Sequence, residues 1–133
     1  MGISVIVVDD DRDNLEVMTE YLELKDVKVL ARASNGKEAF EFYIKNKPEI
    51  VLLDVIMPDY DGFYALEKIK EHDHTAKVIF VTAASQERTQ EKLFETNVDG
   101  VIFKPFEMEK LMQAIKSVQN GEKWIPNSVR SKT

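Results

Sequence analysis

The chain contains no cysteine among its 133 residues. Disulfide bonds, thiolate metal sites and a cysteine nucleophile are therefore excluded. No apolar run approaches the roughly 20 residues that a membrane-spanning helix needs. No cationic region precedes the short apolar stretch near the N-terminus, so we expect neither a signal peptide nor membrane insertion. A lack of cysteine is compatible with the cytoplasm, which is the location that we expect.

Positive charge is also scarce, with 18 Lys and Arg against 24 Asp and Glu and a net charge of −6. An acidic chain is a poor match for the phosphates of nucleic acid, so we expect no direct nucleic-acid binding. The content of 44% hydrophobic and 32% charged residues is typical of a globular protein. Such a chain is suited to binding other proteins or cations.

Short apolar runs alternate with segments of helical periodicity along the chain. The first run, SVIVV, is rich in β-branched residues and apolar on both faces, as a buried strand is. On the same grounds we predict strands at 4–8, 27–33, 48–54, 77–85 and 100–105. Helices are predicted at 13–25, 34–46, 63–73, 86–97 and 107–121. This alternation predicts an α/β fold with a parallel sheet covered on both faces.

Two segments in the second half carry weaker patterns. The helix predicted at 86–97 has a thin apolar face, mainly Leu93 and Phe94, which indicates modest local stability. The last helix is expected to stop at Gly121. We therefore expect a single domain at 1–121, followed by a tail or linker at 122–133.

Polar side chains mark the ends of four of the five predicted strands. Asp9 and Asp10 follow the first strand, Asp54 ends the third, Thr82 lies at the end of the fourth and Lys104 at the end of the fifth. In open parallel sheets, ligands bind beyond the carboxyl ends of the strands. We therefore expect these side chains to converge at one edge of the sheet.

The types of residue in this group indicate its chemistry. Clustered carboxylates without His or Cys suit a hard cation such as Mg²⁺, and a dication would explain why three aspartates are crowded together from Asp9 to Asp11. A hydroxyl and an ammonium aimed at the same point would hold phosphoryl oxygens. One carboxylate would then act as a nucleophile and form an acyl phosphate.

Nearby polar residues have simpler interpretations. Asp11, Asp13 or Asn14 would serve as a helix cap, and Asp13 is otherwise an exposed charge. His72 and His74 lie in a charged segment without a partner of metal-ligand type, so we expect both to be exposed to solvent.

Four stretches match one family in order and at fitting spacings: VIVVDD, IVLLDVIMPDYDGF, VIFVTAAS and DGVIFKPF. Through them, roughly residues 2–120 resemble the receiver domain of two-component response regulators. The resemblance implies a flavodoxin-like doubly wound fold with strand order 2-1-3-4-5. It implies a phosphoacceptor signalling domain and not an enzyme, with Mg²⁺-dependent self-phosphorylation from small donors and autodephosphorylation.

The resemblance also implies individual roles. Asp54 stands where the family has its phosphoacceptor, which is also a metal ligand. Asp9 and Asp10 match the acidic pair that binds Mg²⁺, for which Mn²⁺ can substitute, and Asp10 is expected to touch the metal more directly. The backbone carbonyl of Ile56 would be the remaining protein ligand. Thr82 matches the hydroxyl residue that hydrogen-bonds the phosphoryl group and moves on activation.

The stretch DGVIFKPF matches the family at one functional position and differs from many members at another. Lys104 matches the lysine that pairs with a phosphoryl oxygen, and the Lys104–Pro105 peptide bond is expected to be cis. Val101 stands where many family members have Tyr or Phe, so a rotamer switch of an aromatic ring cannot operate at this position. Phe103 is expected to face the same side of the strand at a different depth.

The implied phosphodonor is a sensor histidine kinase or a histidine phosphotransfer protein, whose phosphohistidine would donate to Asp54. Phosphorylation would switch the surface formed by the fourth helix, the fifth strand and the fifth helix, at 86–97, 100–105 and 107–121. A downstream partner or an output domain would bind that surface.

Three alternatives stay open. Asp9-x-Asp11 also resembles the nucleophile–acid pair of haloacid-dehalogenase-type phosphatases, although Arg12 and Asp13 follow it instead of Gly-Thr and Asp54 would have no role. A receiver-like module that binds partners without being phosphorylated is a second alternative. The third concerns context, because the chain fits either a free-standing regulator or a receiver from a longer protein with an output domain.

Overall fold

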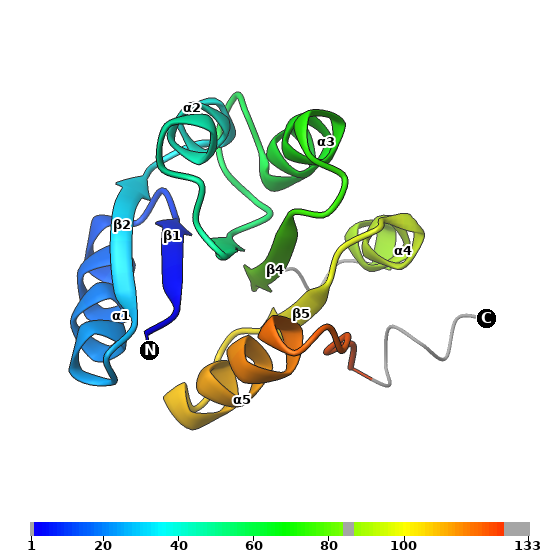
Figure 1. The fold of residues 1–133 in the computed structure, drawn as a ribbon. Helices are drawn as coiled ribbons and strands as arrows, with labels where there is room; N and C mark the ends of the chain where they lie inside the picture. The colour runs from blue at the N-terminus through cyan, green and yellow to red at the C-terminus, as the bar shows by residue number, and fades with distance from the viewer. Residues whose placement is uncertain (1, 84–86, 127–133) are drawn as a thin grey trace.

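The computed structural model describes residues 2–83 and 87–126 (Figure 1). Its strands are β1 (Ser4–Val8), β2 (Lys28–Ala33), β3 (Ile50–Leu53), β4 (Lys77–Thr82) and β5 (Gly100–Phe103). Its helices are α1 (Arg12–Leu24), α2 (Gly36–Asn46), α3 (Gly62–His72), α4 (Glu87–Glu95) and α5 (Met108–Gln119). The predicted alternation of strands and helices is confirmed, with ends that differ from the prediction by a few residues.

The five strands form one parallel sheet in the order β2-β1-β3-β4-β5. The strand order reverses between β1 and β3, because the chain first moves outward to β2 and then returns across β1. The flavodoxin-like fold and its strand order, which the resemblance implied, are therefore confirmed. In such a sheet the crevice beyond the carboxyl ends of β1 and β3 is where ligands bind.

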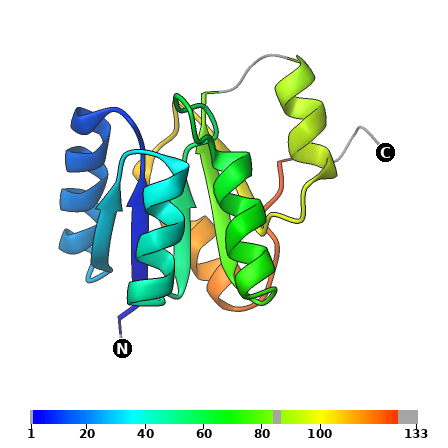
Figure 2. The same ribbon diagram turned by 90° about the horizontal axis from the view of Figure 1, so that it is seen from above.

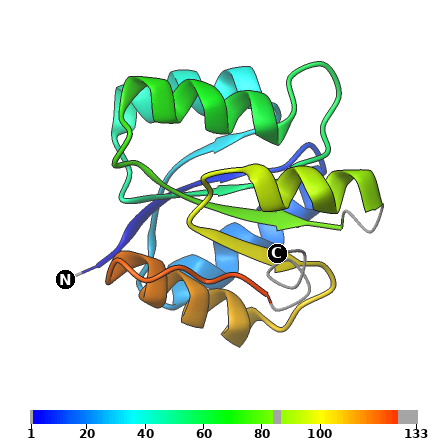
Figure 3. The same cartoon turned by 90° about the vertical axis from the view of Figure 1, so that its right-hand side faces the viewer.

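Helices cover both faces of the sheet, and Figures 2 and 3 show the two layers. The strand residues alternate between them: Ile6 and Val8 belong to the core cluster with α2, α3 and α4, whereas Val5 and Val7 belong to the cluster with α1 and α5. Both faces of β1 are thus buried, because successive side chains of a strand point to opposite faces. This explains why SVIVV is apolar throughout.

Side-chain caps fix where the helices begin. Asp11 caps α1 by accepting hydrogen bonds from the backbone N–H groups of Asp13 and Asn14, at 2.9 and 3.3 Å. Asn35 caps α2, and the neighbouring Ser34 contributes by donating its N–H to Glu38 at 2.8 Å. Among the cap candidates from the sequence, Asp11 is therefore the cap of α1, and Asp13 is an exposed residue of its first turn.

The helix α4 has few buried side chains among those that the structure describes. Leu93 is buried, and the ammonium of Lys92 lies 4.4 Å from the ring centre of Phe63 on α3. The side chain of Phe94, predicted to share the apolar face, lies outside the described part of the chain. The described contacts fit the thin apolar face that the sequence predicts.

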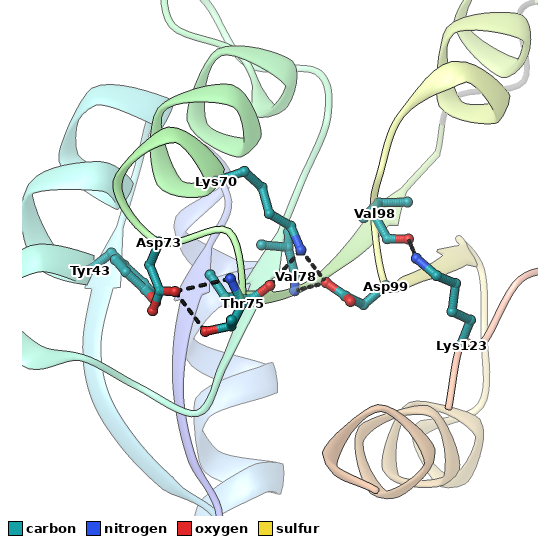
Figure 4. Close-up of polar contacts among 9 residues, drawn as sticks. Tyr43, Lys70, Asp73, Thr75, Val78, Val98, Asp99 and Lys123 are labelled. Carbon is teal, nitrogen blue, oxygen red and sulfur yellow. Dashed lines mark hydrogen bonds and ion pairs between the residues drawn. The ribbon is translucent and has the colours of Figure 1, made fainter. Parts of the chain in front are cut away.

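Polar contacts tie the loops together at the end of the sheet opposite the crevice (Figure 4). Asp99, before β5, accepts hydrogen bonds from Lys70 on α3 at 3.0 Å and from the N–H of Val78 on β4 at 2.8 Å. Tyr43 on α2 donates to Asp73 at 3.1 Å, and burial together with this carboxylate raises the pKa of Tyr43 to about 12. These contacts fix α2, α3, β4 and β5 relative to one another.

The two histidines of the α3–β4 region are exposed, as predicted. The ring of His72 contacts the edges of Phe40 and Tyr43, with ring centres 6.2 and 6.4 Å apart. His74 lies in the following turn. Neither belongs to the group of potential metal ligands found among the described residues.

The first residues of the segment predicted as a tail or linker contact the sheet. Trp124 forms a parallel bridge with Gly100, the first residue of β5. Residues 127–133 lie outside the part of the chain that the structure describes. No helix in the described ranges is both long enough and apolar enough to cross a bilayer.

Candidate functional site

The carboxyl ends of β1 and β3 bring two aspartates side by side. Val8 and Leu53 are paired in the sheet, and Asp9 and Asp54 are the residues that follow them. Oxygen atoms of Asp9, Asp10 and Asp54 all lie within 4.8 Å of one another. Parallel pairing in register therefore creates the cluster that the strand ends predicted.

The three carboxylates differ in exposure. Asp9 and Asp54 are buried, with relative exposures of 3% and 8%, whereas Asp10 is exposed. Two buried acids and one exposed acid form a cluster that solvent reaches at Asp10. A hard cation in such a cluster would keep several of its water molecules, as Mg²⁺ does in proteins.

Lys104 lies between the two buried acids. Its ammonium nitrogen is 2.8 Å from Asp9 Oδ2 and 3.6 Å from Asp54 Oδ2. Burial acts to lower the pKa of Lys104, but the hydrogen bond to Asp9 and the charges of both carboxylates outweigh it, and the pKa is raised. This ammonium therefore stays protonated at neutral pH. The Lys104–Pro105 bond is cis, as the resemblance implied.

Asp54 is the acid whose ionisation is most perturbed. Burial raises its pKa from 3.8 to about 6, with the Asp9 carboxylate adding to the rise and the Lys104 charge opposing it. The N–H of Ile56 donates to Asp54 Oδ1 at 3.4 Å, which also favours the charged form. The carboxylate is thus mostly ionised at pH 7, yet weakly solvated, which suits a nucleophile.

Thr82 ends β4 next to this group. It pairs with Phe103 on β5, and its carbonyl accepts the N–H of Lys104 at 2.8 Å. Its side chain is fully buried. The backbone of Thr82 therefore fixes the point at which the chain turns from β5 into the loop that carries Lys104.

The carboxylate set fits a divalent cation. Three carboxylates within 4.8 Å, two of them buried, provide hard oxygen ligands without His or Cys. The only cation that the described contacts place among them is the Lys104 ammonium, which neutralises part of their charge. Ile56, whose carbonyl the resemblance implies as a further ligand, lies two residues after Asp54 with its side chain exposed.

Two supporting features were not recognised in the sequence. Asp9 is held by the N–H of Asp11 at 2.9 Å and by the side-chain amide of Asn14 at 3.4 Å. Gly62, at the start of α3, packs so closely that a Cβ there would lie 2.3 Å from the Asp54 carbonyl oxygen. The Asp61-Gly62 pair at the start of α3 was a visible signal for a turn, but the close approach of Gly62 to Asp54 follows only from the fold.

Val101 and Phe103 on β5 lie on the same face of the sheet, as two residues that are two positions apart in a strand do. Val101 is fully buried, and Phe103 packs against the same core cluster, on the side of α4. No aromatic ring occupies position 101, so any switch in this protein works through other groups.

The domain is doubly wound and carries an acidic cluster beside a partly buried lysine, and comparison with known proteins identifies its family. The family model of the response regulator receiver domain matches residues 5–116. The chain is 36% identical to the chemotaxis protein CheY of Halobacterium salinarum over 118 residues, which are 89% of this chain and 98% of that protein. The chain belongs to the response regulator receiver domain family.

Other relatives carry the same domain in different contexts. The transcriptional regulatory protein SrrA of Staphylococcus aureus is 31% identical over 118 residues, 89% of this chain but only 48% of that protein. A solved complex of CheX and CheY with BeF3 and Mg from Borrelia burgdorferi superposes with a TM-score of 0.80 at 29% identity, covering 87% of this chain and 88% of that one. The chain thus spans nearly all of one relative and about half of another.

Membership of this family confirms the resemblance drawn from the four sequence stretches. It also weighs against the phosphatase alternative, which needed Asp11 as an acid next to a nucleophilic Asp9. In the structure Asp11 Oδ1 is occupied by the capping hydrogen bonds of α1, and Asp9 is paired with Lys104.

Proposed function

We propose that this receiver domain accepts a phosphoryl group on Asp54 in a two-component phosphorelay. A sensor histidine kinase or a histidine phosphotransfer protein would be the donor. The observation that carries the proposal is the position of Asp54: its carboxylate forms a cluster with those of Asp9 and Asp10 within 4.8 Å and lies 3.6 Å from the Lys104 ammonium.

Each residue around Asp54 would have a separate role in phosphoryl transfer. Asp54 attacks phosphorus, so that a bond forms between its carboxylate oxygen and the phosphoryl group while the bond to the donor nitrogen breaks. Asp9, Asp10, Asp54 and the Ile56 carbonyl would hold Mg²⁺ or Mn²⁺, which when bound supplies positive charge for the phosphoryl oxygens. Lys104, kept protonated by its carboxylate neighbours, would pair with a phosphoryl oxygen.

The proposed output is a change in the surface made by α4, β5 and α5. Thr82 would hydrogen-bond the phosphoryl group and move toward Asp54, and it lies on β4 directly beside β5. The described part of α4 rests on few buried side chains, so a modest free-energy change suffices to move it. Since position 101 is Val, the movement would be transmitted by packing changes and not by an aromatic rotamer.

Related proteins indicate which partners are plausible. CheY of Borrelia burgdorferi was solved with CheX in the presence of BeF3 and Mg, and SrrA is a transcriptional regulator. By analogy, we propose that a downstream protein or an output domain reads the α4–β5–α5 surface of this chain. We propose a domain boundary near residue 121 and a cytoplasmic location, where histidine kinases present their phosphohistidine.

The test is intact-mass spectrometry after incubation with acetyl phosphate, in Mg²⁺ or in EDTA. We expect one added phosphoryl group that requires both Mg²⁺ and Asp54, and that is lost by autodephosphorylation. Asp13→Asn is the matched control, because Asp13 is exposed in the first turn of α1 and should leave the modification unchanged. A folded chain that gains no mass would instead support a module that binds partners without phosphorylation.

A further inference from the structure

After α5 the chain turns back and lies along the open edge of the sheet. Trp124 donates its N–H to the Asp99 carbonyl at 3.0 Å, and its own carbonyl accepts the N–H of Val101 at 2.9 Å. Because β5 is the last strand of the sheet, these groups would otherwise face outward. We call Lys123–Ile125 the strap, and it pairs with β5 as a short sixth strand would.

The side chains of the strap alternate between the two faces of the sheet. Trp124 packs against the core cluster of α5, and Ile125 packs against the cluster of α3 and α4. Lys123 donates to the Val98 carbonyl at 3.2 Å, just before β5 (Figure 4). Figure 3 shows this segment, in red, between α4 and α5. The strap therefore lies in the middle of the α4–β5–α5 surface.

The attachment of the strap is weak compared with that of a true strand. It consists of the two backbone hydrogen bonds that make up one isolated bridge and the hydrogen bond from Lys123, whereas β4 and β5 are paired over four positions. Trp124 and Ile125 are only partly buried. The strap follows Gly121, which has φ +87° and no atom within 4 Å of the position that a Cβ would take. Segments with few buried contacts open locally, without unfolding of the whole domain.

We propose that the outer edge of β5 is a strand-addition site that the strap occupies and keeps closed. The partner that this site fits is an extended peptide with an aromatic residue followed by a β-branched residue, which would take the places of Trp124 and Ile125. The Val101 N–H has room for one acceptor, so the strap and such a peptide exclude each other. That the strap thereby limits access of a signalling partner rests on the proposed function, whereas the strand-addition site does not.

The unmodified protein provides the first test, by amide hydrogen exchange. The Val101 N–H bonds to the strap, whereas the Lys104 N–H bonds inward to Thr82 at 2.8 Å. If the strap detaches by local opening while the sheet stays intact, the amide hydrogen of Val101 should exchange with solvent at least about tenfold faster than that of Lys104. Equal exchange of the two amides, limited by global unfolding, would overturn the proposal.

The second test adds the occupant in trans. A labelled peptide with the sequence of residues 120–126 is titrated by fluorescence anisotropy against the full chain and against the double variant Trp124→Ala, Ile125→Ser. We expect the peptide to bind the double variant at least about tenfold more tightly than the unmodified chain, because the resident strap no longer competes. Equal affinity for both chains, or no binding to the folded variant, would contradict a strand-addition site.

Matched controls identify the cause of the binding. A peptide in which Trp and Ile exchange places puts each side chain toward the wrong face, and should bind the double variant at least about tenfold more weakly. Glu122→Gln changes an exposed residue beside the strap and should bind the peptide like the unmodified chain. Protection of the Lys104 amide reports that the variant is folded, and if it is not, the exchange test on the unmodified protein decides.

Failure of the proposed function and failure of the strand-addition site give different experimental results. Phosphorylation of the double variant by acetyl phosphate is measured in parallel, and Asp54 lies at the opposite end of the β-strands from the Asp99 contact with the strap. If neither chain is phosphorylated while the peptide binds as expected, the proposed function fails and the strand-addition site stands. If both are phosphorylated but the peptide binds neither, the strap proposal fails alone.

Discussion

Lys104 Nζ lies 2.8 Å from Asp9 Oδ2 and 3.6 Å from Asp54 Oδ2, so one ammonium serves two buried carboxylates from different strands. The arrangement leaves one positive charge against two negative charges, with the exposed Asp10 adding a third. A surplus of negative charge among partly buried carboxylates costs stability until a cation compensates for it.

Asp54→Asn should stabilise the metal-free protein at neutral pH. In the folded state the Asp54 pKa is raised from 3.8 to about 6, so the folded state binds the proton more tightly than the unfolded state. Stability contributed by this group is therefore present below pH 4 and lost as the pH rises through about 6. The shift corresponds to up to about 3 kcal/mol at pH 7 and above, which urea denaturation at several pH values in EDTA would measure. Asp13→Asn, on the exposed turn of α1, should show no such pH-dependent gain.

Mg²⁺ should raise the thermal stability of the chain, because it binds the folded carboxylate cluster and not the unfolded chain. At a concentration 100 times the dissociation constant the gain is about 2.7 kcal/mol. The rise in Tm should disappear with EDTA, in Asp9→Asn, and as the ligands become protonated at low pH. A rise of equal size in Asp9→Asn would show that the ion acts elsewhere.

Lys104→Met should destabilise the protein at pH 7, because it leaves two buried carboxylates without their cation. Breaking such a pair costs about 2–4 kcal/mol, and the loss should shrink as the pH falls below about 6, where the Asp54 carboxyl becomes protonated in the folded state. Lys70→Met is the matched control, since Lys70 pairs with Asp99 at 3.0 Å at the far end of the sheet. Both variants should lose stability in urea, but only Lys104→Met should impair phosphorylation by acetyl phosphate.

Gly62→Ala should disrupt the site through the backbone. The new Cβ would lie 2.3 Å from the Asp54 carbonyl oxygen and 2.8 Å from the Cα of Val55, so the loop after β3 must shift. We expect a loss of about 2 kcal/mol or more, in the range of overpacked positions, together with weaker Mg²⁺ binding. Gly121→Ala has an unfavourable φ but meets no atom within 4 Å, and should leave Mg²⁺ binding unchanged. Normal Mg²⁺ affinity in Gly62→Ala would show that this close approach does not position Asp54.

The sheet and the position of the acidic cluster could be predicted from the sequence, because both follow from regular patterns. A parallel strand buried on both faces is a continuous apolar run, and the residue after each run must lie at the same edge of the sheet. Asp9 and Asp54 are therefore neighbours whenever β1 and β3 are paired in register. The sequence motifs around Asp9 and Asp54 indicated the family.

Other features depend on the three-dimensional structure. The sequence placed Lys104 at the same edge of the sheet as Asp9 and Asp54. Its hydrogen bond to Asp9 and its ion pair with Asp54 could not be predicted, because the partners lie 95 and 50 positions away in a chain of 133. The strap was predicted as part of a tail or linker because its pairing with β5 uses backbone groups, which every residue carries. A single Trp followed by Ile and Pro gives no alternating pattern long enough to indicate a strand.

The most direct test of the central claim is to locate the phosphoryl group. The chain is incubated with acetyl phosphate and Mg²⁺, reduced with sodium borohydride, which converts an aspartyl phosphate to homoserine, and then mapped by peptide mass spectrometry. We predict homoserine at position 54 and at no other aspartate, and none without Mg²⁺. Homoserine at position 9, 10 or 11 would contradict the account, since it would move the nucleophile to the cluster after β1.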